Sequence, residues 1–322
     1  MAELDLIDRR LLYELDLNAR LSSSQLAKKL RKSKETINFR LNRLLKENYL
    51  KGFYAVLNTS KLGWYYHKMY FKLKSIPPEK EEEIFNYLKA QPNVSYLASM
   101  EGQYNGVCLL FCKTPKDTDD FLRPFLKKYG EFIQEKEFTT FLTVHRFNQK
   151  FLYAGQAQED WHYPFELGNY QLDETDSKLL GALSSDARLL LVDIAKSAGA
   201  DAQVIKYRIK KLEKDGIILA YATAPNFEKL GLQFFQINIS LVDPSLRLNI
   251  ISYFDSTNKC LYAMEMIGKY DLAVELHLPA GTELKSILDG FRKKYSEKIS
   301  SYDISTVSRE YVVEWGPFKA KE

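Results

Sequence analysis

The chain contains an internal repeat, and this repeat constrains its fold more than any other feature of the sequence. Residues 4–63 align with residues 172–231 at a constant offset of 168 positions, without a gap. The segment Leu4-Asp5-x-x-Asp8 matches Leu172-Asp173-x-x-Asp176, for example. Further along the chain, the matches continue at an offset of 166. The sequence therefore predicts one two-part unit that occurs twice.

The first part of each unit has the pattern of three short helices followed by a strand. Ser33 and Asp201 are residue types that favour the N-cap, and each precedes the third helix of its copy. Gly216 is the expected stop of that helix in the second copy. This order of elements predicts winged helix-turn-helix domains at residues 1–60 and 171–228.

The second part of each unit has the pattern β-α-β-β-α-β. This order predicts an α+β domain of ferredoxin-like type, a four-stranded antiparallel sheet with two helices on one face, at residues 61–150 and 229–318. The open face of such a sheet has to be covered, and we expect the two sheets to pair face to face within the chain. Residues 151–170 join the copies and are rich in aromatic residues, so we expect an ordered linker.

Composition excludes several classes of protein. The chain has 46 Lys and Arg against 42 Asp and Glu, so a nucleic-acid site has to appear as a local cluster of charge. No apolar run reaches the roughly 18 residues of a membrane helix, and the start of the chain is polar and acidic. The cysteines, Cys108, Cys112 and Cys260, form no disulfide framework, which fits a reducing compartment. We expect a cytoplasmic protein without membrane contact.

The residues that usually carry catalysis are not arranged in a known pattern. The four histidines, His67, His145, His162 and His277, have neither metal-ligand nor triad spacing. The chain also lacks GxGxxG, GxxxxGK[ST] and GxSxG segments. We therefore expect no metal, no cofactor and no enzymatic activity.

The ordered set of motifs resembles the Lrp/AsnC family of transcription regulators. The segments that carry the resemblance are Leu4-Asp-x-x-Asp8, Ala19-Arg20, Leu26-Ala27, Ser33-x-x-Thr36-Ile37-x-x-Arg40-Leu41-x-x-Leu44 and Leu62-Gly63, with their second-copy matches and Gly268-x-Tyr270-Asp271. The resemblance covers nearly the whole chain twice, whereas a usual member carries one copy and pairs with another chain. It implies double-stranded DNA as a partner, and an amino acid or related metabolite as an effector bound between paired effector domains, the ferredoxin-like domains.

Helical periodicity predicts which side chains of the third helix face DNA. With Ile37 inward, the outer face carries amide, basic and aromatic groups that suit a major groove. The predicted contacts of the first copy are Lys34, Thr36, Asn38, Phe39, Arg40, Asn42, Arg43 and Lys46. Those of the second copy are Gln203, Lys206, Tyr207, Arg208, Lys210 and Lys211. For the two aromatic residues, the alternative is packing against a neighbouring helix.

Charge distinguishes the two winged helix domains. Residues 4–60 hold twelve Lys and Arg against six Asp and Glu, whereas residues 172–228 hold eight against nine. Because neutralising phosphates supplies most non-specific affinity, we hypothesise that the first domain is the main DNA reader. The second then binds weakly, reads an adjacent half-site or is mainly structural.

The hairpin turns of the ferredoxin-like domains are the candidate effector sites. Glycine allows sharp bends and the approach of a small ligand to main-chain groups. The candidate residues are Gly102, Tyr104, Asn105, Gly268, Tyr270 and Asp271. The alternative is a β-turn without a ligand.

The sequence thus predicts a transcription regulator in which two effector domains pair within one chain, with further assembly into a homo-oligomer through exposed strand edges. One alternative is an enzyme that resembles siroheme decarboxylases, which share this two-part architecture. Its expected histidine is absent from Ser99–Tyr104 and from Met264–Tyr270. A second alternative is a ligand-sensing interaction protein that does not bind DNA.

Overall fold

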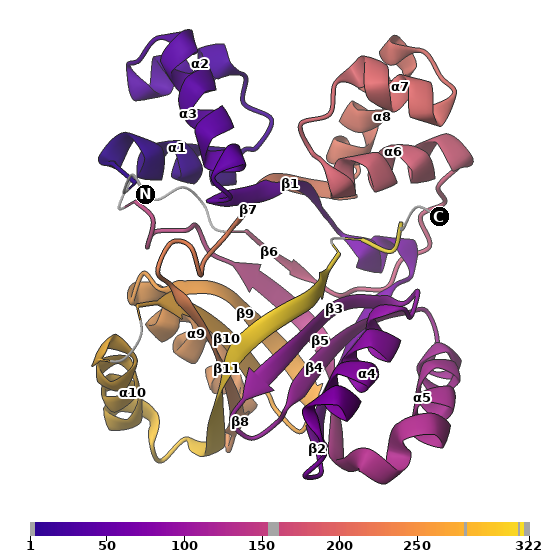
Figure 1. Cartoon of the computed structure of the whole chain (residues 1–322), viewed down its shortest axis with the longest axis vertical. Helices are drawn as coiled ribbons and strands as arrows, with labels where there is room; N and C mark the ends of the chain where they lie inside the picture. Colours follow the sequence, from indigo (N-terminus) through magenta and orange to yellow (C-terminus); the bar gives the residue numbers. More distant parts are fainter. Residues whose placement is uncertain (1–3, 154–160, 280–281, 315, 319–322) are drawn as a thin grey trace.

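The computed structural model describes residues 4–153, 161–279, 282–314 and 316–318. Within them, both copies of the repeat fold as predicted, with two helical domains at one end of the molecule and the large sheet at the other (Figure 1). The first copy contains α1 (Leu6–Leu17), α2 (Ser23–Leu30), α3 (Lys34–Lys46), β1 (Leu50–Leu57), η1 (Thr59–Leu62), β2 (Tyr65–Leu73), α4 (Pro78–Lys89), β3 (Val94–Glu101), β4 (Gly106–Cys112), α5 (Pro115–Tyr129), η2 (Gly130–Phe132) and β5 (Ile133–Arg146).

The second copy repeats this order after the short strand β6 (Trp161–Pro164). Its elements are α6 (Glu174–Ser185), α7 (Leu191–Ala198), α8 (Ala202–Lys214), β7 (Ile218–Pro225), β8 (Gln233–Leu241), η3 (Pro244–Leu246), α9 (Arg247–Ser256), β9 (Cys260–Gly268), β10 (Leu272–Leu278), α10 (Thr282–Tyr295) and β11 (Ile299–Val313).

Local signals place the ends of the third helices. The Ser33 hydroxyl accepts a hydrogen bond from the backbone N–H of Thr36, which confirms it as the N-cap of α3. Asp201 occupies the N-cap position of α8, although its side chain makes no capping bond. Gly216, with φ of +67°, adopts the left-handed conformation expected at the end of α8, and Asn48 does the same after α3 with φ of +57°.

The two winged helix domains form one packed body. Strand β1 of the first domain pairs antiparallel with β7 of the second, with Ala55 opposite Tyr221. Matched backbone bonds join each domain to the other's strand: Ala19 N–H donates to the Tyr221 carbonyl over 2.9 Å, and Ala187 N–H to the Phe53 carbonyl over 3.1 Å. A single hydrophobic core runs through both domains. The orientation of α3 relative to α8 is therefore fixed within the chain.

The strands of the effector domains close into a ring. Their order is β5-β2-β4-β3-β11-β8-β10-β9, and β9 pairs again with β5. The expected face-to-face pairing is thus incomplete, because the long last strands β5 and β11 also join the two sheets edge to edge. Each effector-domain strand has a neighbour on both sides among the described residues. The unpaired edges that we expected to drive further assembly are therefore absent from this part of the chain.

Helices α4, α5, α9 and α10 cover the outside of the ring (Figure 1). Each copy has its own core between its helices and its sheet, and a third core inside the ring is built from aromatic and sulfur-containing side chains of both copies.

We propose to divide the chain into domains at residues 60, 150, 170 and 228. In the linker, β6 pairs with β5, whereas residues 154–160 lie outside the described residues. No helix in the described ranges is both long and apolar enough to cross a membrane.

Candidate nucleic-acid interface

Helices α3 and α8 lie in the helical domains at the end of the molecule away from the strand ring (Figure 1). Ile37, Leu41 and Leu44 are buried, as the periodicity predicts, so the opposite side of α3 faces outward. Phe39 and Tyr207 occupy matched positions, and each is 68% exposed. The alternative that these two aromatic residues pack against a neighbouring helix is therefore wrong.

Two of the predicted DNA-contacting arginines join helices together. The Arg40 guanidinium lies 2.8 Å from the carboxylates of Asp5 and Asp8. Arg208 makes the same pair of contacts in the second copy, with Asp173 at 2.6 Å and Asp176 at 2.9 Å. The Leu-Asp-x-x-Asp segments of the repeat thus provide the acidic partners that hold α3 against α1 and α8 against α6.

Arg43 is engaged in the first copy only. It pairs with Asp8, whereas the matched residue of the second copy, Lys211, is exposed and has no acidic partner among the described residues. The hydroxyl of Thr36 is half-buried and lies 3.1 Å from that of Ser33. The predicted residues that stay exposed and unpaired in the described structure are Lys34, Asn38, Phe39, Asn42, Lys46, Gln203, Lys206, Tyr207, Lys210 and Lys211.

The exposed charge of the recognition helices differs from what the domain charges suggest. Helix α3 presents Lys34 and Lys46, because its two arginines are paired internally. The exposed lysines of α8 number four: Lys206, Lys210, Lys211 and Lys214. Because the two arginines of α3 are paired internally, α8 offers more unpaired cations to phosphates than α3 does.

A pair of arginines that we did not predict fixes the spacing between the two domains. Arg20 donates to the Ala187 carbonyl over 2.6 Å, and Arg188 donates to the Ala19 carbonyl over 2.5 Å. Arg20 lies over the Tyr221 ring, and burial lowers the pKa of the Arg188 guanidinium. The repeated Ala-Arg-Leu segment is the sequence signal that could have located this arginine clasp, formed by Arg20 and Arg188.

The hairpin residues of the two effector domains meet inside the ring. The hydroxyls of Tyr104 and Tyr270 lie 3.3 Å apart, and both side chains are buried. Lys269 donates to the Tyr104 hydroxyl over 2.5 Å and to Glu135 over 3.0 Å. Those contacts raise the pKa of Lys269 despite the opposing effect of burial. Tyr104 and Tyr270, one predicted effector residue from each copy, thus meet in one polar cluster.

The remaining hairpin residues have structural contacts. A Cβ on Gly102 would lie 2.5 Å from the Ile304 carbonyl, and one on Gly268 would lie 2.5 Å from the Phe138 carbonyl. Both glycines also have positive φ, so they serve the close approach of strands from opposite copies. The side chains of Asn105 and Asp271 accept hydrogen bonds from the backbone of the neighbouring strand, at Leu73 and Leu241. Effector binding at these hairpins stays a prediction.

Comparison with known proteins identifies the helical domains. The family model described as winged helix-turn-helix DNA-binding matches residues 4–51 and again residues 172–218. The HTH-type transcriptional regulator Ptr1 of Methanocaldococcus jannaschii is 32% identical over 119 residues, which span 37% of this chain and 79% of Ptr1. An uncharacterised HTH-type transcriptional regulator of Pyrococcus abyssi is 28% identical over 146 residues, which span 44% of this chain and 99% of the relative. The matches to these relatives thus cover less than half of this chain.

A solved structure shares the arrangement of both units. The match to the crystal structure of the siroheme decarboxylase NirDL covers 95% of this chain and 92% of the NirDL chain. Its TM-score is 0.65, and the two sequences are 14% identical. Such a low identity shows a common fold and nothing about activity. Taken with the two winged helix matches and the identity to Ptr1, the repeated motifs place this chain in the Lrp/AsnC family of transcription regulators.

Proposed function

We propose that the chain is a sequence-specific DNA-binding transcription regulator whose two winged helix domains contact one duplex together. The observation that carries the proposal is the position of α3 and α8, which are exposed at one end of the molecule and held in one body by β1, β7 and the arginine clasp. A single chain then offers the pair of recognition helices that a two-fold dimer offers.

We infer that the two helices contribute differently to binding. Asn38 and Asn42 of α3 are exposed, and an amide can pair bidentately with an adenine edge. The matched residues of α8 are Lys206 and Lys210, which as point charges are suited to phosphates. This assignment replaces the hypothesis that the first domain dominates because of its total charge.

The experiment selects preferred duplexes from a random pool and measures affinity against salt concentration. The double variant Asn38→Ala/Asn42→Ala should lose discrimination by about 1–3 kcal/mol per lost bidentate contact and keep the salt dependence. The matched variant Lys206→Ala/Lys210→Ala should weaken all duplexes alike and reduce the slope of log K against log salt by about 2. Absence of salt-sensitive duplex binding by the intact chain would contradict the proposal.

We propose that an amino acid or related small metabolite controls this activity from the hairpin cluster of Tyr104, Lys269 and Glu135. The support is the convergence of both hairpins on one set of hydroxyl, ammonium and carboxylate groups. Calorimetry against a panel of amino acids tests the idea, with Lys269→Met as the variant expected to lose binding. If no member of the panel binds, the hairpins are turns without a ligand.

We also propose that the chain acts by binding rather than catalysis, in the cytoplasm, because its relatives carry the names of transcription regulators. Adding a porphyrin to the purified protein should cause no shift of the Soret band. A shift together with turnover of siroheme would favour the enzyme alternative. Homo-oligomer formation stays a prediction, and sedimentation velocity of the intact chain tests it.

A further inference from the structure

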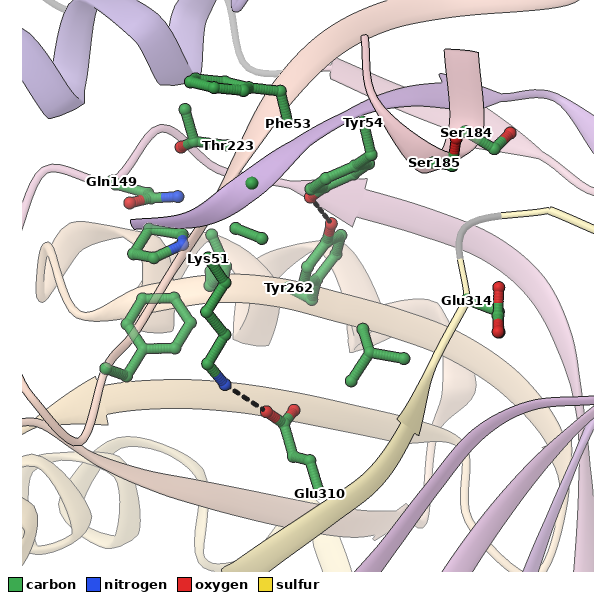
Figure 2. A pocket seen from close by; sticks show the side chains of 16 residues that line it. Lys51, Phe53, Tyr54, Gln149, Ser184, Ser185, Thr223, Tyr262, Glu310 and Glu314 are labelled. Atoms are coloured by element: carbon green, nitrogen blue, oxygen red, sulfur yellow. Dashed lines mark hydrogen bonds and ion pairs between the residues drawn. The ribbon is translucent and has the colours of Figure 1, made fainter. Parts of the chain in front are cut away.

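A cavity of about 190 Å³ lies between the paired wing strands and the inside of the strand ring. Matched residues of both copies line it, among them Tyr96 with Tyr262. It adjoins a second pocket with which it shares Tyr54, Tyr262 and Glu310 (Figure 2). There Lys51 of β1 reaches toward Glu310 of β11, with 3.5 Å between ammonium and carboxylate. The cavity therefore touches both the DNA-binding body and the effector domains.

Three polar residues of this cavity are replaced by other residue types in the other copy. Lys68, Glu275 and His277 line it. At the positions that the repeat matches to them stand Gln236, Leu109 and Phe111. Hence the cavity has one buried charged end, and its remaining wall is aromatic and aliphatic apart from Ser95, Glu310 and Glu314. An apolar pocket with a few convergent polar groups is the usual form of a small-molecule site.

The charged end is buried and incompletely paired. The ammonium of Lys68, whose side chain is 4% exposed, donates to the Gln236 side chain over 2.9 Å and lies 3.9 Å from Glu275. His277 is 2% exposed, and its Nδ1 has no hydrogen-bond partner among the described residues. Burial lowers the pKa of His277 to about 3, so its ring is neutral and can accept a hydrogen bond. A ligand that donates hydrogen bonds would complete this end.

The balance of charge favours a cation. Three carboxylates, Glu275, Glu310 and Glu314, line the cavity, whereas its one lining lysine is Lys68 and Lys51 approaches Glu310 from the adjoining pocket. Burial raises the pKa of Glu275, and the nearby Glu310 raises it further, although Lys68 opposes both effects. A second positive charge would favour the ionised form of Glu275. The faces of Tyr54 and Tyr262 add a preference for cations.

We propose that the cavity binds a small aryl-alkylamine, with its ammonium group at Glu275 and His277 and its ring among the aromatic side chains. A dry cavity of about 150 Å³ is enough to hold a benzene ring, so the volume of about 190 Å³ has room for an aromatic ring with a short alkyl chain. A carboxylate on the ligand would add a negative charge to the three that already line the cavity, which distinguishes amines from amino acids. Any effect of the ligand on DNA rests on the proposed function, whereas the binding itself does not.

Calorimetry of the full chain without DNA tests the binding. Tryptamine and 2-phenylethylamine are the probes, and indole-3-acetate and L-tryptophan are the comparison compounds. We expect both amines to bind at least tenfold more tightly than either comparison compound. Glu275→Gln should weaken amine binding at least tenfold, whereas Glu131→Gln, an exposed carboxylate outside the cavity, should change nothing.

Two further variants guard against misfolding as an explanation. His277→Phe introduces the residue that the repeat carries at the matched position, and Val144→Phe fills the space from the other side. With native circular dichroism, both should lose amine binding. Failure of both amines to bind, or equal binding of amines and indole-3-acetate, would overturn the proposal. Because no DNA is present, failure of the regulator proposal would leave this result unchanged.

Discussion

Among single residues, a buried ion pair lies where the two copies differ. Asp16 and Arg146 are both at least 97% buried, and their side chains lie 2.5 Å apart. The Asp16 carboxylate also accepts from Gln149 over 2.9 Å and from the Thr223 hydroxyl over 3.0 Å. This network links α1, the end of β5 and β7, so it ties the helical body to the strand ring. The matched position of Asp16 in the second copy is Ser184.

Replacing Asp16 by Ala should lower the free energy of unfolding by about 3–5 kcal/mol, because it leaves the Arg146 charge buried without a partner. Urea denaturation followed by circular dichroism measures the change. Ser184→Ala is the matched control and should change stability by less than about 1 kcal/mol. Equal midpoints for the two variants would contradict this account.

The burial of His277 allows a prediction of how the free energy of unfolding depends on pH. Burial lowers its pKa to about 3, whereas the unfolded chain takes up the proton near pH 6.5. Its contribution to stability is therefore complete above pH 6.5 and is lost as pH falls toward 3, by about 2 kcal/mol at pH 5. The variant His277→Phe should lack this pH-dependent contribution to stability. The difference between the two stability curves should grow below pH 6.5, and a constant difference would contradict the prediction.

At the scale of elements, helix patterns were predictable and strand lengths were less so. The N-cap Ser33 and the stop at Gly216 are local signals, so α3 and α8 were located from the sequence. The sequence pattern predicts that the last strands of the two copies begin at Phe138 and Tyr302, whereas β5 and β11 begin at Ile133 and Ile299. Their additional residues are mostly polar, and they become strands because they pair with β2 and β8 of their own copies. Pairing of this kind is a tertiary effect that no local pattern reports.

The arginine clasp sets the spacing of the recognition helices, and its loss should be visible in DNA binding. Each lost hydrogen bond from a charged group removes about 1.5–3 kcal/mol of interaction between the domains. Arg20→Ala/Arg188→Ala should therefore bind duplexes with altered half-site spacing nearly as well as the preferred duplex. The wild type should discriminate between them. Arg123→Ala, an exposed arginine of α5, is the control and should keep the preference.

For the whole molecule, the duplicated architecture was predictable from the sequence. The effects of the differences between the copies depend on contacts that form only in the folded chain. That Arg40 and Arg208 are paired internally depends on α1 and α6 lying beside α3 and α8. The buried charged end of the cavity likewise forms only because Lys68 and Glu275 meet inside the ring, although they are more than 200 residues apart in the sequence. Periodicity in the sequence indicates which face of a helix or strand is buried, but it does not indicate which residues that face contacts.

Because the two recognition helices differ in sequence, we predict an operator without two-fold symmetry. Because Asn38 and Asn42 are matched by Lys206 and Lys210, the two half-sites should differ in sequence. A duplex with two unlike half-sites should bind at least tenfold more tightly than a palindrome built from either half. Fluorescence anisotropy on the three duplexes measures this, and preference for a palindrome would contradict it.

The intrachain pairing of β1 with β7 also has a consequence for the cell. A regulator assembled from separate subunits falls apart on dilution and can exchange subunits with paralogues. Here the two halves are covalently tethered, so their local concentration stays high however scarce the protein becomes. Each half can therefore diverge through mutation and still keep its partner, because pairing of the two halves does not depend on how much protein the cell makes.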